Sequence, residues 1–162
     1  MALKGVSELK QKGWLFRLEL PSDPEILSVV RSAVTSLANN FGFGEEESRA
    51  VTRAVDEALA NIICHAYQNR RDQPIEILCR RVDEHSPSGE KPALEIVLVD
   101  HGPAVDCKTF CGRSLDDVRP GGLGMHFIES GVDVVQYSRR GGKNRIRMVK
   151  YLPTQDTKRT SA

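Results

Sequence analysis

The segment around which this chain is organised is Ala54-Val55-Asp56-Glu57-Ala58-Leu59-Ala60-Asn61-Ile62-Ile63-Cys64-His65-Ala66-Tyr67. Neither proline nor glycine interrupts residues 45–68, and alanine and leucine are strong helix formers, so a long helix is predicted here. Apolar residues recur at spacings of three and four, which gives this helix one apolar face. Glu57 and Asn61 are four positions apart and therefore project from the same side, roughly 5–6 Å apart at Cβ. A carboxylate that can take a proton thus lies beside an amide oxygen that can bind a hard cation, although an isolated pair of this kind is more often simply solvated.

The composition is that of an ordinary globular protein. The chain has 162 residues, of which 40% are hydrophobic and 28% charged, and its net charge is +1. We therefore expect one domain, and bulk electrostatics give no reason to expect a nucleic-acid partner. The longest clean apolar run, residues 96–99, is too short to span a membrane, and the N-terminus lacks the apolar core of a signal peptide. These observations predict a cytoplasmic protein with no membrane partner.

Apolar periodicity and turn residues predict the remaining elements. Residues 85–92 are expected to form a surface turn, and Gly141-Gly142 the turn of a closing hairpin. Short connections between strands favour an antiparallel or mixed, mostly antiparallel sheet with the helices layered on one face, which is a two-layer α+β sandwich. The expected strands are 14–20, 75–82, 94–100, 132–138 and 144–152, the other expected helices are 24–40 and 123–130, and the domain spans 13–152 between flexible ends at 1–12 and 153–162.

Residues 101–120 show no sustained periodicity. Loops of this length are uncommon in compact domains unless they are functional, so we expect a lid at about 105–119. Cys64 and Cys79 fall in a predicted helix and strand, where reduced, partly buried thiols are expected. Cys107 and Cys111 lie in the loop near a histidine, but their spacing lacks the close cysteine pairs of structural zinc sites, so zinc is disfavoured.

Two further segments carry candidate site residues. Asp100 ends a hydrophobic strand and Gly102 follows it, so the carboxylate can accept a hydrogen bond from an exocyclic amine while the backbone passes close by. Taken alone, an Asp-x-Gly turn is the commoner meaning of this pattern. Three glycines within 121–124 precede a helix, where free backbone N–H groups bind phosphate, and Arg119 adds charge-assisted contacts. A plain glycine-rich turn explains this second segment about equally well.

Together, the three segments resemble the Bergerat-fold ATPases shared by type II topoisomerases, the ninety-kilodalton chaperones, mismatch-repair ATPases and histidine kinases. Residues 54–67 are similar to the asparagine-containing box, Asp100-His101-Gly102 to the first glycine box and Gly121-Gly122-Leu123-Gly124-Met125 to the second. The amino-acid sequences of 54–67 and 122–128 resemble more closely those of the anti-sigma-factor serine kinases of bacterial partner switching. The resemblance covers about residues 14–152.

The resemblance implies an ATP site and a role for each matched residue. Asn61 would ligate a Mg²⁺ ion bridging the ATP phosphates, and a single asparagine suffices because Mg²⁺ usually takes only one or two protein ligands. Glu57 would accept the proton of the attacking hydroxyl, and Asp100 would hold the adenine amine. The remaining nucleotide-binding residues would be Asn61, Gly102, Arg119, Gly121, Gly122, Leu123, Gly124, Met125 and Asn144.

The resemblance also implies protein partners. The chain would phosphorylate a serine or threonine of a small antagonist protein and sequester a sigma factor or similar partner, as a homodimer and without nucleic acid. Most of the catalysis would come from positioning and electrostatic neutralisation. Two positions depart from the family pattern. Ala104 replaces a glycine of the first glycine box, and Lys143-Asn144 replaces a Gly-Thr pair whose hydroxyl supports the adenine-binding carboxylate, although Asn144 can donate a hydrogen bond instead.

Two other hypotheses stay open beside the kinase. One is a non-catalytic binding module in which nucleotide only sets the affinity for a partner, and the other is a detached histidine-kinase-type ATP domain. Glu57 favours the kinase over the module, because nucleotide binding alone does not need a base. No phosphoacceptor-histidine dimerisation helix precedes the domain in this sequence, which disfavours a complete histidine kinase.

Overall fold

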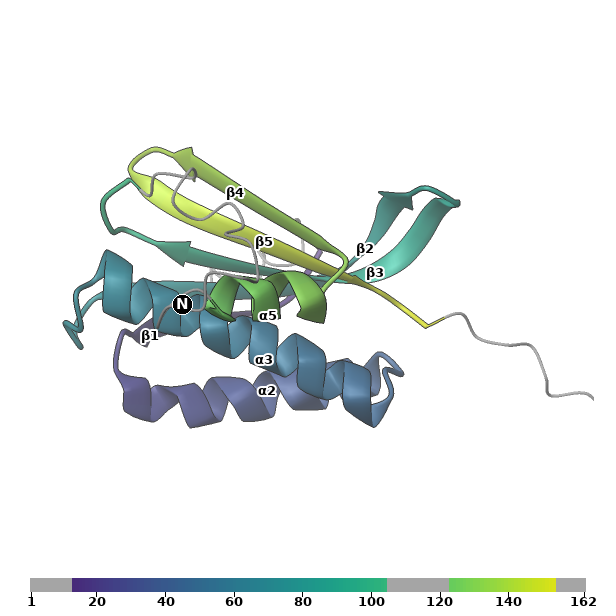
Figure 1. Ribbon diagram of the computed structural model, residues 1–162, viewed down its shortest axis with the longest axis horizontal. Helices are drawn as coiled ribbons and strands as arrows, with labels where there is room; N and C mark the ends of the chain where they lie inside the picture. The colour runs from purple at the N-terminus through teal and green to yellow at the C-terminus, as the bar shows by residue number, and fades with distance from the viewer. Residues whose placement is uncertain (1–12, 105–122, 154–162) are drawn as a thin grey trace, which may run out of the picture.

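The computed structural model describes residues 13–104 and 123–153, which form two layers (Figure 1). A five-stranded sheet makes one layer, and α2, α3 and α5 cover one face of it. The predicted two-layer α+β sandwich is therefore confirmed. The elements in chain order are β1 (Trp14–Pro21), the short 3₁₀ helix η1 (Pro24–Ile26), α2 (Leu27–Asn40), α3 (Glu45–Asn61), the π-helix η2 (Ile62–Ala66), β2 (Pro74–Ser86), β3 (Gly89–Asp100), α5 (Leu123–Gly131), β4 (Val134–Arg140) and β5 (Lys143–Tyr151).

The sheet has the strand order β1-β2-β3-β5-β4. All four pairings of the described strands are antiparallel, so the sheet is antiparallel rather than mixed. β3 is the central strand, and its residues 93–100 are buried without interruption. Its last residue, Asp100, lies opposite Asn144 of β5. The sheet therefore brings together two residues from separate parts of the chain.

β2 and β3 extend further than their apolar pattern predicts. The surface turn expected at 85–92 is wrong, because β2 continues to Ser86 and β3 already begins at Gly89, whose φ of +105° suits the tight turn. Asp83 and Glu84 pair with Pro92 and Lys91 in this extension. The extension is mostly exposed and projects beyond the rest of the sheet (Figure 1). Backbone pairing rather than an apolar face holds it, so periodicity does not reveal it.

The long helix predicted at 45–68 changes geometry before its end. It is α-helical only to Asn61, and the following turn, Ile62–Ala66, is a π-helix in which the Tyr67 N–H donates to the Ile62 carbonyl at 2.9 Å. Helix propensity does not distinguish an α-turn from a π-turn, so the sequence prediction of one regular helix was wrong here. π-Turns inside helices occur frequently at functional sites.

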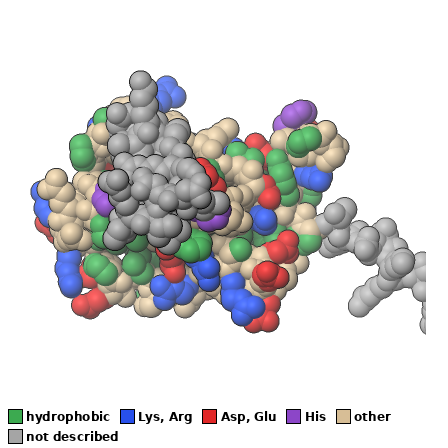
Figure 2. Space-filling view, viewed as in Figure 1, with side chains coloured by type: hydrophobic (Ala, Val, Ile, Leu, Met, Phe, Trp, Pro, Cys, Tyr) green, Lys and Arg blue, Asp and Glu red, His purple; other side chains and the backbone are tan. Residues whose placement is uncertain are grey.

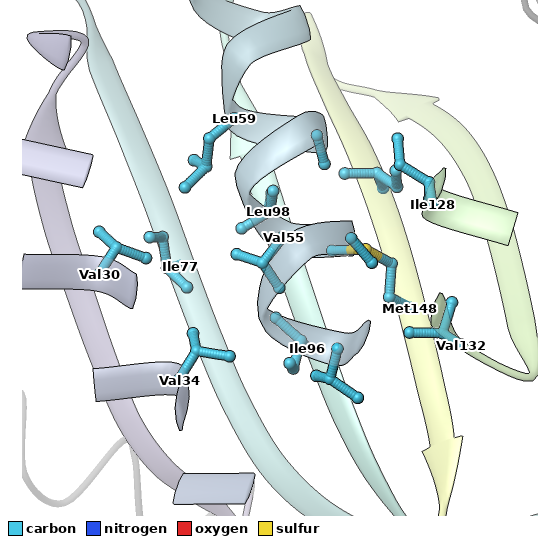
Figure 3. Packing of buried hydrophobic residues seen from close by; sticks show 14 of the residues in the cluster. Val30, Val34, Val55, Leu59, Ile77, Ile96, Leu98, Ile128, Val132 and Met148 are labelled. Carbon is cyan, nitrogen blue, oxygen red and sulfur yellow. The ribbon is translucent and has the colours of Figure 1, made fainter. Parts of the chain in front are cut away.

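The hydrophobic core fills the space between the helices and the sheet (Figure 3). Gly131, at the end of α5, allows α5 and α3 to pack closely, since a methyl group there would lie 2.5 Å from the Ala50 carbonyl oxygen. This close packing positions the start of α5 beside α3. The core receives Val30 and Val34 from α2, Val55 and Leu59 from α3, Ile77, Ile96, Leu98 and Met148 from the central strands, and Ile128 and Val132 from α5 and the residue after it.

The cysteines agree only partly with expectation. Cys79 is fully buried, and burial raises the pKa of its thiol to about 12. Cys64 is exposed, contrary to the prediction, because Ile62 and Ile63 are the residues of that turn that face the core. Cys107 and Cys111 lie outside the described residues, as does the predicted lid at 105–119.

Charged side chains of both signs are interspersed over the helical layer (Figure 2). Several form ion pairs, including Arg31 with Asp56 and Arg49 with Glu45. Within the part of the chain that the structure describes, no helix is both long and apolar enough to cross a membrane.

Candidate functional site

A cavity of about 420 Å³ lies where α3, η2 and α5 meet the ends of β3, β4 and β5. Its volume falls within the roughly 300–1,000 Å³ of small-molecule sites. Three of the predicted site residues, Asn61, Asp100 and Asn144, line this cavity. Its apolar lining comes from Ala58, Ile62, Ala66, Pro103, Ala104, Ile128 and Ile146, and its other lining residues are His65, Tyr137, Ser138, Arg139 and Arg145.

Asp100 presents a buried carboxylate to this cavity, with only 5% of the residue exposed. Its Oδ1 accepts hydrogen bonds from the Gly102 N–H and from Asn144 Nδ2, each at 2.8 Å. No described residue donates to Oδ2. An ionised carboxylate accepts on both oxygens, so Asp100 keeps an acceptor for a ligand amine.

Gly102 allows a close approach that a side chain would prevent. A methyl group at this position would lie 2.7 Å from Ala66 Cβ and 2.9 Å from Asp100 Oδ1. The backbone after β3 can therefore lie directly against η2 only because residue 102 is a glycine.

Tyr67 joins the same region from the end of η2. Its hydroxyl accepts from the His101 N–H at 2.8 Å and donates to the Pro74 carbonyl at 2.6 Å. Burial raises the pKa of the Tyr67 hydroxyl, so it stays protonated and keeps its role as donor. The hydroxyl thus ties the end of β3 to the start of β2 and holds Asp100 at the cavity edge.

Asn144 contacts Asp100 as the substitute donor that the sequence suggested. Besides the bond to Asp100, its Nδ2 donates to the Pro103 carbonyl at 3.0 Å and lies 3.4 Å from the Gly102 carbonyl. Arg139 donates to Asn144 Oδ1, and the same Nη1 donates to the Gly102 carbonyl at 3.0 Å. Asn144 therefore supplies the hydrogen bond to Asp100 that the Gly-Thr pair would otherwise support.

Glu57 and Asn61 lie against the start of α5. A methyl group on Gly124 would be 2.9 Å from Glu57 Oε2 and 3.9 Å from both terminal atoms of Asn61. Asn61 lines the cavity, whereas Glu57 lies one helical turn away and outside its lining. Gly124, the glycine of the second glycine segment that the structure describes, thus lies beside the predicted carboxylate and amide.

The other predicted site residues are described only in part. Met125 is half-buried, and its sulfur accepts from the Tyr137 hydroxyl at 3.5 Å. Leu123 begins α5, but its side chain is not described. Arg119, Gly121 and Gly122 lie outside the described residues.

Sequence reasoning missed Arg139 and the apolar walls of the cavity. Arg139 lies opposite Asn144 across the β4–β5 hairpin. Gly141 and Gly142 form a two-residue turn with φ of +58° and +77°, and such a turn sets the register of its strands. The glycine pair was therefore the signal that could have revealed the contact.

The residues of this site fit a nucleotide whose base carries an amine. The site combines a buried carboxylate with an available oxygen, apolar walls, and glycines in close approach. No group of three or more His, Cys, Asp or Glu side chains suitable for a metal occurs within residues 13–104 and 123–153. A Mg²⁺ ion held by one amide oxygen, phosphates and water needs no such group.

Comparisons with known proteins agree with this arrangement. The model of the family described as histidine kinase-like ATPase domain matches residues 20–150. The serine-protein kinase RsbW of Bacillus pumilus is 25% identical over 146 residues, which is 85% of this chain and 86% of the relative. RsbW of Listeria innocua is 29% identical over 143 residues, 83% of this chain and 85% of the relative.

Solved structures share the fold. The SiaB–SiaC complex from Pseudomonas aeruginosa contains a chain with a TM-score of 0.60 at 13% identity, covering 92% of this chain and 98% of that one. The RsbU and RsbW domains of Rv1364c from Mycobacterium tuberculosis give a TM-score of 0.53 at 14% identity, covering 85% of this chain and 32% of that one. Since the family model spans most of the chain, including all three motif segments, this chain belongs to the histidine kinase-like ATPase family, which implies ATP binding, and is distantly related to the RsbW kinases over most of its length.

Proposed function

We propose that this chain is an ATP-dependent protein serine/threonine kinase that phosphorylates a small antagonist protein and sequesters a sigma factor or similar regulated protein. The observation that carries the proposal is the position of Glu57, whose carboxylate meets the start of α5 beside Asn61. A nucleotide-binding domain without phosphoryl transfer does not need a base there. The similarity to serine-protein kinases over 83–85% of the chain supports the same conclusion.

The proposed nucleotide site uses both glycine segments. Asp100 accepts from the adenine amine through its available oxygen, and the apolar walls cover the ring. Asn61 ligates Mg²⁺, which when bound neutralises phosphate charge. The other residues that we assign to the nucleotide are Gly102, Arg119, Gly121, Gly122, Leu123, Gly124, Met125 and Asn144.

The proposed reaction moves the terminal phosphoryl group of ATP to a serine or threonine hydroxyl. The hydroxyl oxygen bonds to the γ-phosphorus, the bond to the bridging oxygen breaks, and ADP is released. Glu57 accepts the hydroxyl proton, a step that a positioned carboxylate can accelerate by about 10²–10⁴-fold. The rest of the rate enhancement comes from holding the two substrates in line and balancing charge.

The second candidate is a non-catalytic module in which nucleotide sets the affinity for a partner. The observation that favours it is that Glu57 lies outside the lining of the cavity. In both cases we propose a cytoplasmic homodimer with protein partners rather than nucleic acid or membrane.

The test begins with partners captured from the native cell in the presence of ATP and then ADP, identified by mass spectrometry. Transfer of labelled γ-phosphate to the captured antagonist is then measured for the wild type, Glu57→Gln and the control Glu46→Gln, an exposed residue of the same helix. Glu57→Gln keeps the shape of the side chain but not the base, so ATP and partner binding persist while transfer falls about 10²–10⁴-fold. A wild type that binds ATP but labels no partner supports the binding module instead.

A further inference from the structure

Arg139 and Asn144 face each other across the β4–β5 hairpin, and Asn144 faces Asp100 across the β3–β5 pairing. Arg139 is exposed, whereas Asn144 is 9% exposed and Asp100 5%. Hydrogen bonds follow the same order, from the guanidinium to the amide and from the amide to the carboxylate. A row of three polar side chains therefore runs from the surface to the buried carboxylate of the cavity.

The direction of these hydrogen bonds is fixed by chemistry. A guanidinium only donates, and a carboxylate or a carbonyl only accepts. The amide oxygen of Asn144 must therefore face Arg139, and its nitrogen must face Asp100. In this orientation Asn144 occupies Oδ1 of Asp100, and the other oxygen stays available to a ligand.

Arg139 also holds the backbone that follows β3. Its Nη1 donates to the Gly102 carbonyl at 3.0 Å, and the Gly102 N–H donates to Asp100 Oδ1 at 2.8 Å. Without the guanidinium, the nearly buried oxygen of Asn144 would lose its donor, and the amide would be drawn toward other partners. The carboxylate would then be held by one fewer fixed contact.

We propose that Arg139 is a positioning residue for base recognition. Acting through Asn144, it fixes the Asp100 carboxylate with Oδ2 free for an exocyclic amine. It thereby sets the preference of the site for purine nucleotides with an amine at C6 over those with a carbonyl there. This inference rests on nucleotide binding in the cavity, as in the proposed function, but not on phosphoryl transfer.

A different role for Arg139 makes an opposite prediction. Arg139 lines the cavity, and a cation there attracts the phosphates of any nucleotide. Loss of such an attraction weakens all nucleoside triphosphates alike. Loss of positioning weakens only those nucleotides whose base donates an amine to Asp100, so the ratio of two dissociation constants separates the two roles.

The experiment measures dissociation constants for ATP and ITP by calorimetry. ITP carries a carbonyl oxygen in place of the adenine amine. The proteins are the wild type, Arg139→Met, Asn144→Ala, the double variant, and Arg140→Met as a matched control from the same strand. We expect Arg139→Met to weaken ATP binding about fivefold to tenfold, the effect of one lost hydrogen bond, and to change ITP binding less than about twofold.

The double variant tests the path through Asn144. If Arg139 acts through this amide, adding Arg139→Met to Asn144→Ala changes ATP affinity less than about twofold. Equal losses for ATP and ITP, an undiminished effect in the Asn144→Ala background, or no effect of Arg139→Met would each overturn the proposal. Arg139→Ala takes the place of Arg139→Met if the latter fails to fold.

The outcome for the wild type separates this inference from the proposed function. A wild type that binds neither nucleotide overturns the ATP site and the role of Arg139 together. A wild type that binds ATP and shows the expected ratios, but transfers no phosphate, supports the role of Arg139 and removes only the kinase.

Discussion

Gly124 and Glu57 lie so close together that a methyl group on Gly124 would be 2.9 Å from Glu57 Oε2. The atom in the way is the end of a flexible side chain rather than backbone. The start of α5 therefore leaves room for the Glu57 carboxylate only because residue 124 has no side chain. A substitution at Gly124 should displace Glu57 without breaking the packing of the helices.

Gly124→Ala should lower phosphoryl transfer by at least about tenfold, because the displaced Glu57 no longer stands where a base is needed. Stability should be unchanged or slightly higher, since alanine is favoured over glycine inside a helix by about 1 kcal/mol. Labelled-phosphate transfer and urea unfolding on the same preparation check both expectations. Full activity in this variant would remove Glu57 from the role of base.

Gly131→Ala, unlike Gly124→Ala, should lower the stability of the fold. Its methyl group would lie 2.5 Å from the Ala50 carbonyl oxygen and 2.9 Å from Ala54 Cβ, so α5 must move away from α3. Overpacking of this kind costs about 1–3 kcal/mol. Urea unfolding should show the loss, and an unchanged midpoint would mean that the two helices can separate at no cost.

Asp100 should decide between bases. Asp100→Ala leaves the adenine amine without its acceptor and should weaken ATP binding by about 1–3 kcal/mol. The wild type should bind GTP weakly, because guanine carries a carbonyl where adenine carries the amine. Asp100→Asn keeps an acceptor for the Gly102 N–H and Asn144 but turns the other end into a donor, so it should shift the preference from ATP toward GTP. Calorimetric titrations with both nucleotides test this, and equal affinity of the wild type for ATP and GTP would count against Asp100.

Glu95 should make the fold sensitive to acid. Glu95 is 1% exposed; burial opposes its ionisation, but hydrogen bonds from Arg80 and Arg147 outweigh burial and lower its pKa below the usual 4.5. A pKa that is lower in the folded state contributes stability above the unfolded pKa, and this contribution is lost as the pH falls through the folded pKa.

Glu95→Gln should therefore destabilise the protein at pH 7 by about 3 kcal/mol, the low end for a broken buried ion pair, because both arginines are partly exposed. The difference from the wild type should shrink below about pH 4.5. Urea unfolding at several pH values measures it, with the exposed Glu90→Gln as control. A difference that stays constant down to pH 3 would contradict the assignment.

Periodicity predicted those elements that bury an apolar face. The strands around Leu18, Ile77 and Leu98 and the helix around Val55 could be located because their alternation reflects burial. The ends of β2 and β3 could not, since they are held by backbone pairing and expose polar side chains. The π-turn of η2 was likewise beyond the reach of helix propensity.

The site was predictable where a motif carried it. The family resemblance indicated that Asp100, Asn61 and Gly124 would come together, whereas spacing alone did not. Arg139 lies in none of the three motif segments. Its role depends on a hydrogen bond across the β4–β5 hairpin to Asn144 and on the burial of that residue. Such contacts follow from strand register, which the Gly141-Gly142 turn encodes only indirectly.

The strand order has a consequence for the way in which the protein acquires its cavity. β2 pairs with β3 and β4 with β5, each across a short turn, whereas β3 and β5 meet only after residues 101–142 have been traversed. Closing the longer loop costs more chain entropy, so the two hairpins should form early and join late. Asp100 and Asn144 lie on opposite sides of this junction between the two hairpins. A bound nucleotide should therefore slow unfolding while leaving the folding rate almost unchanged, because the site it recognises does not exist before the two hairpins join.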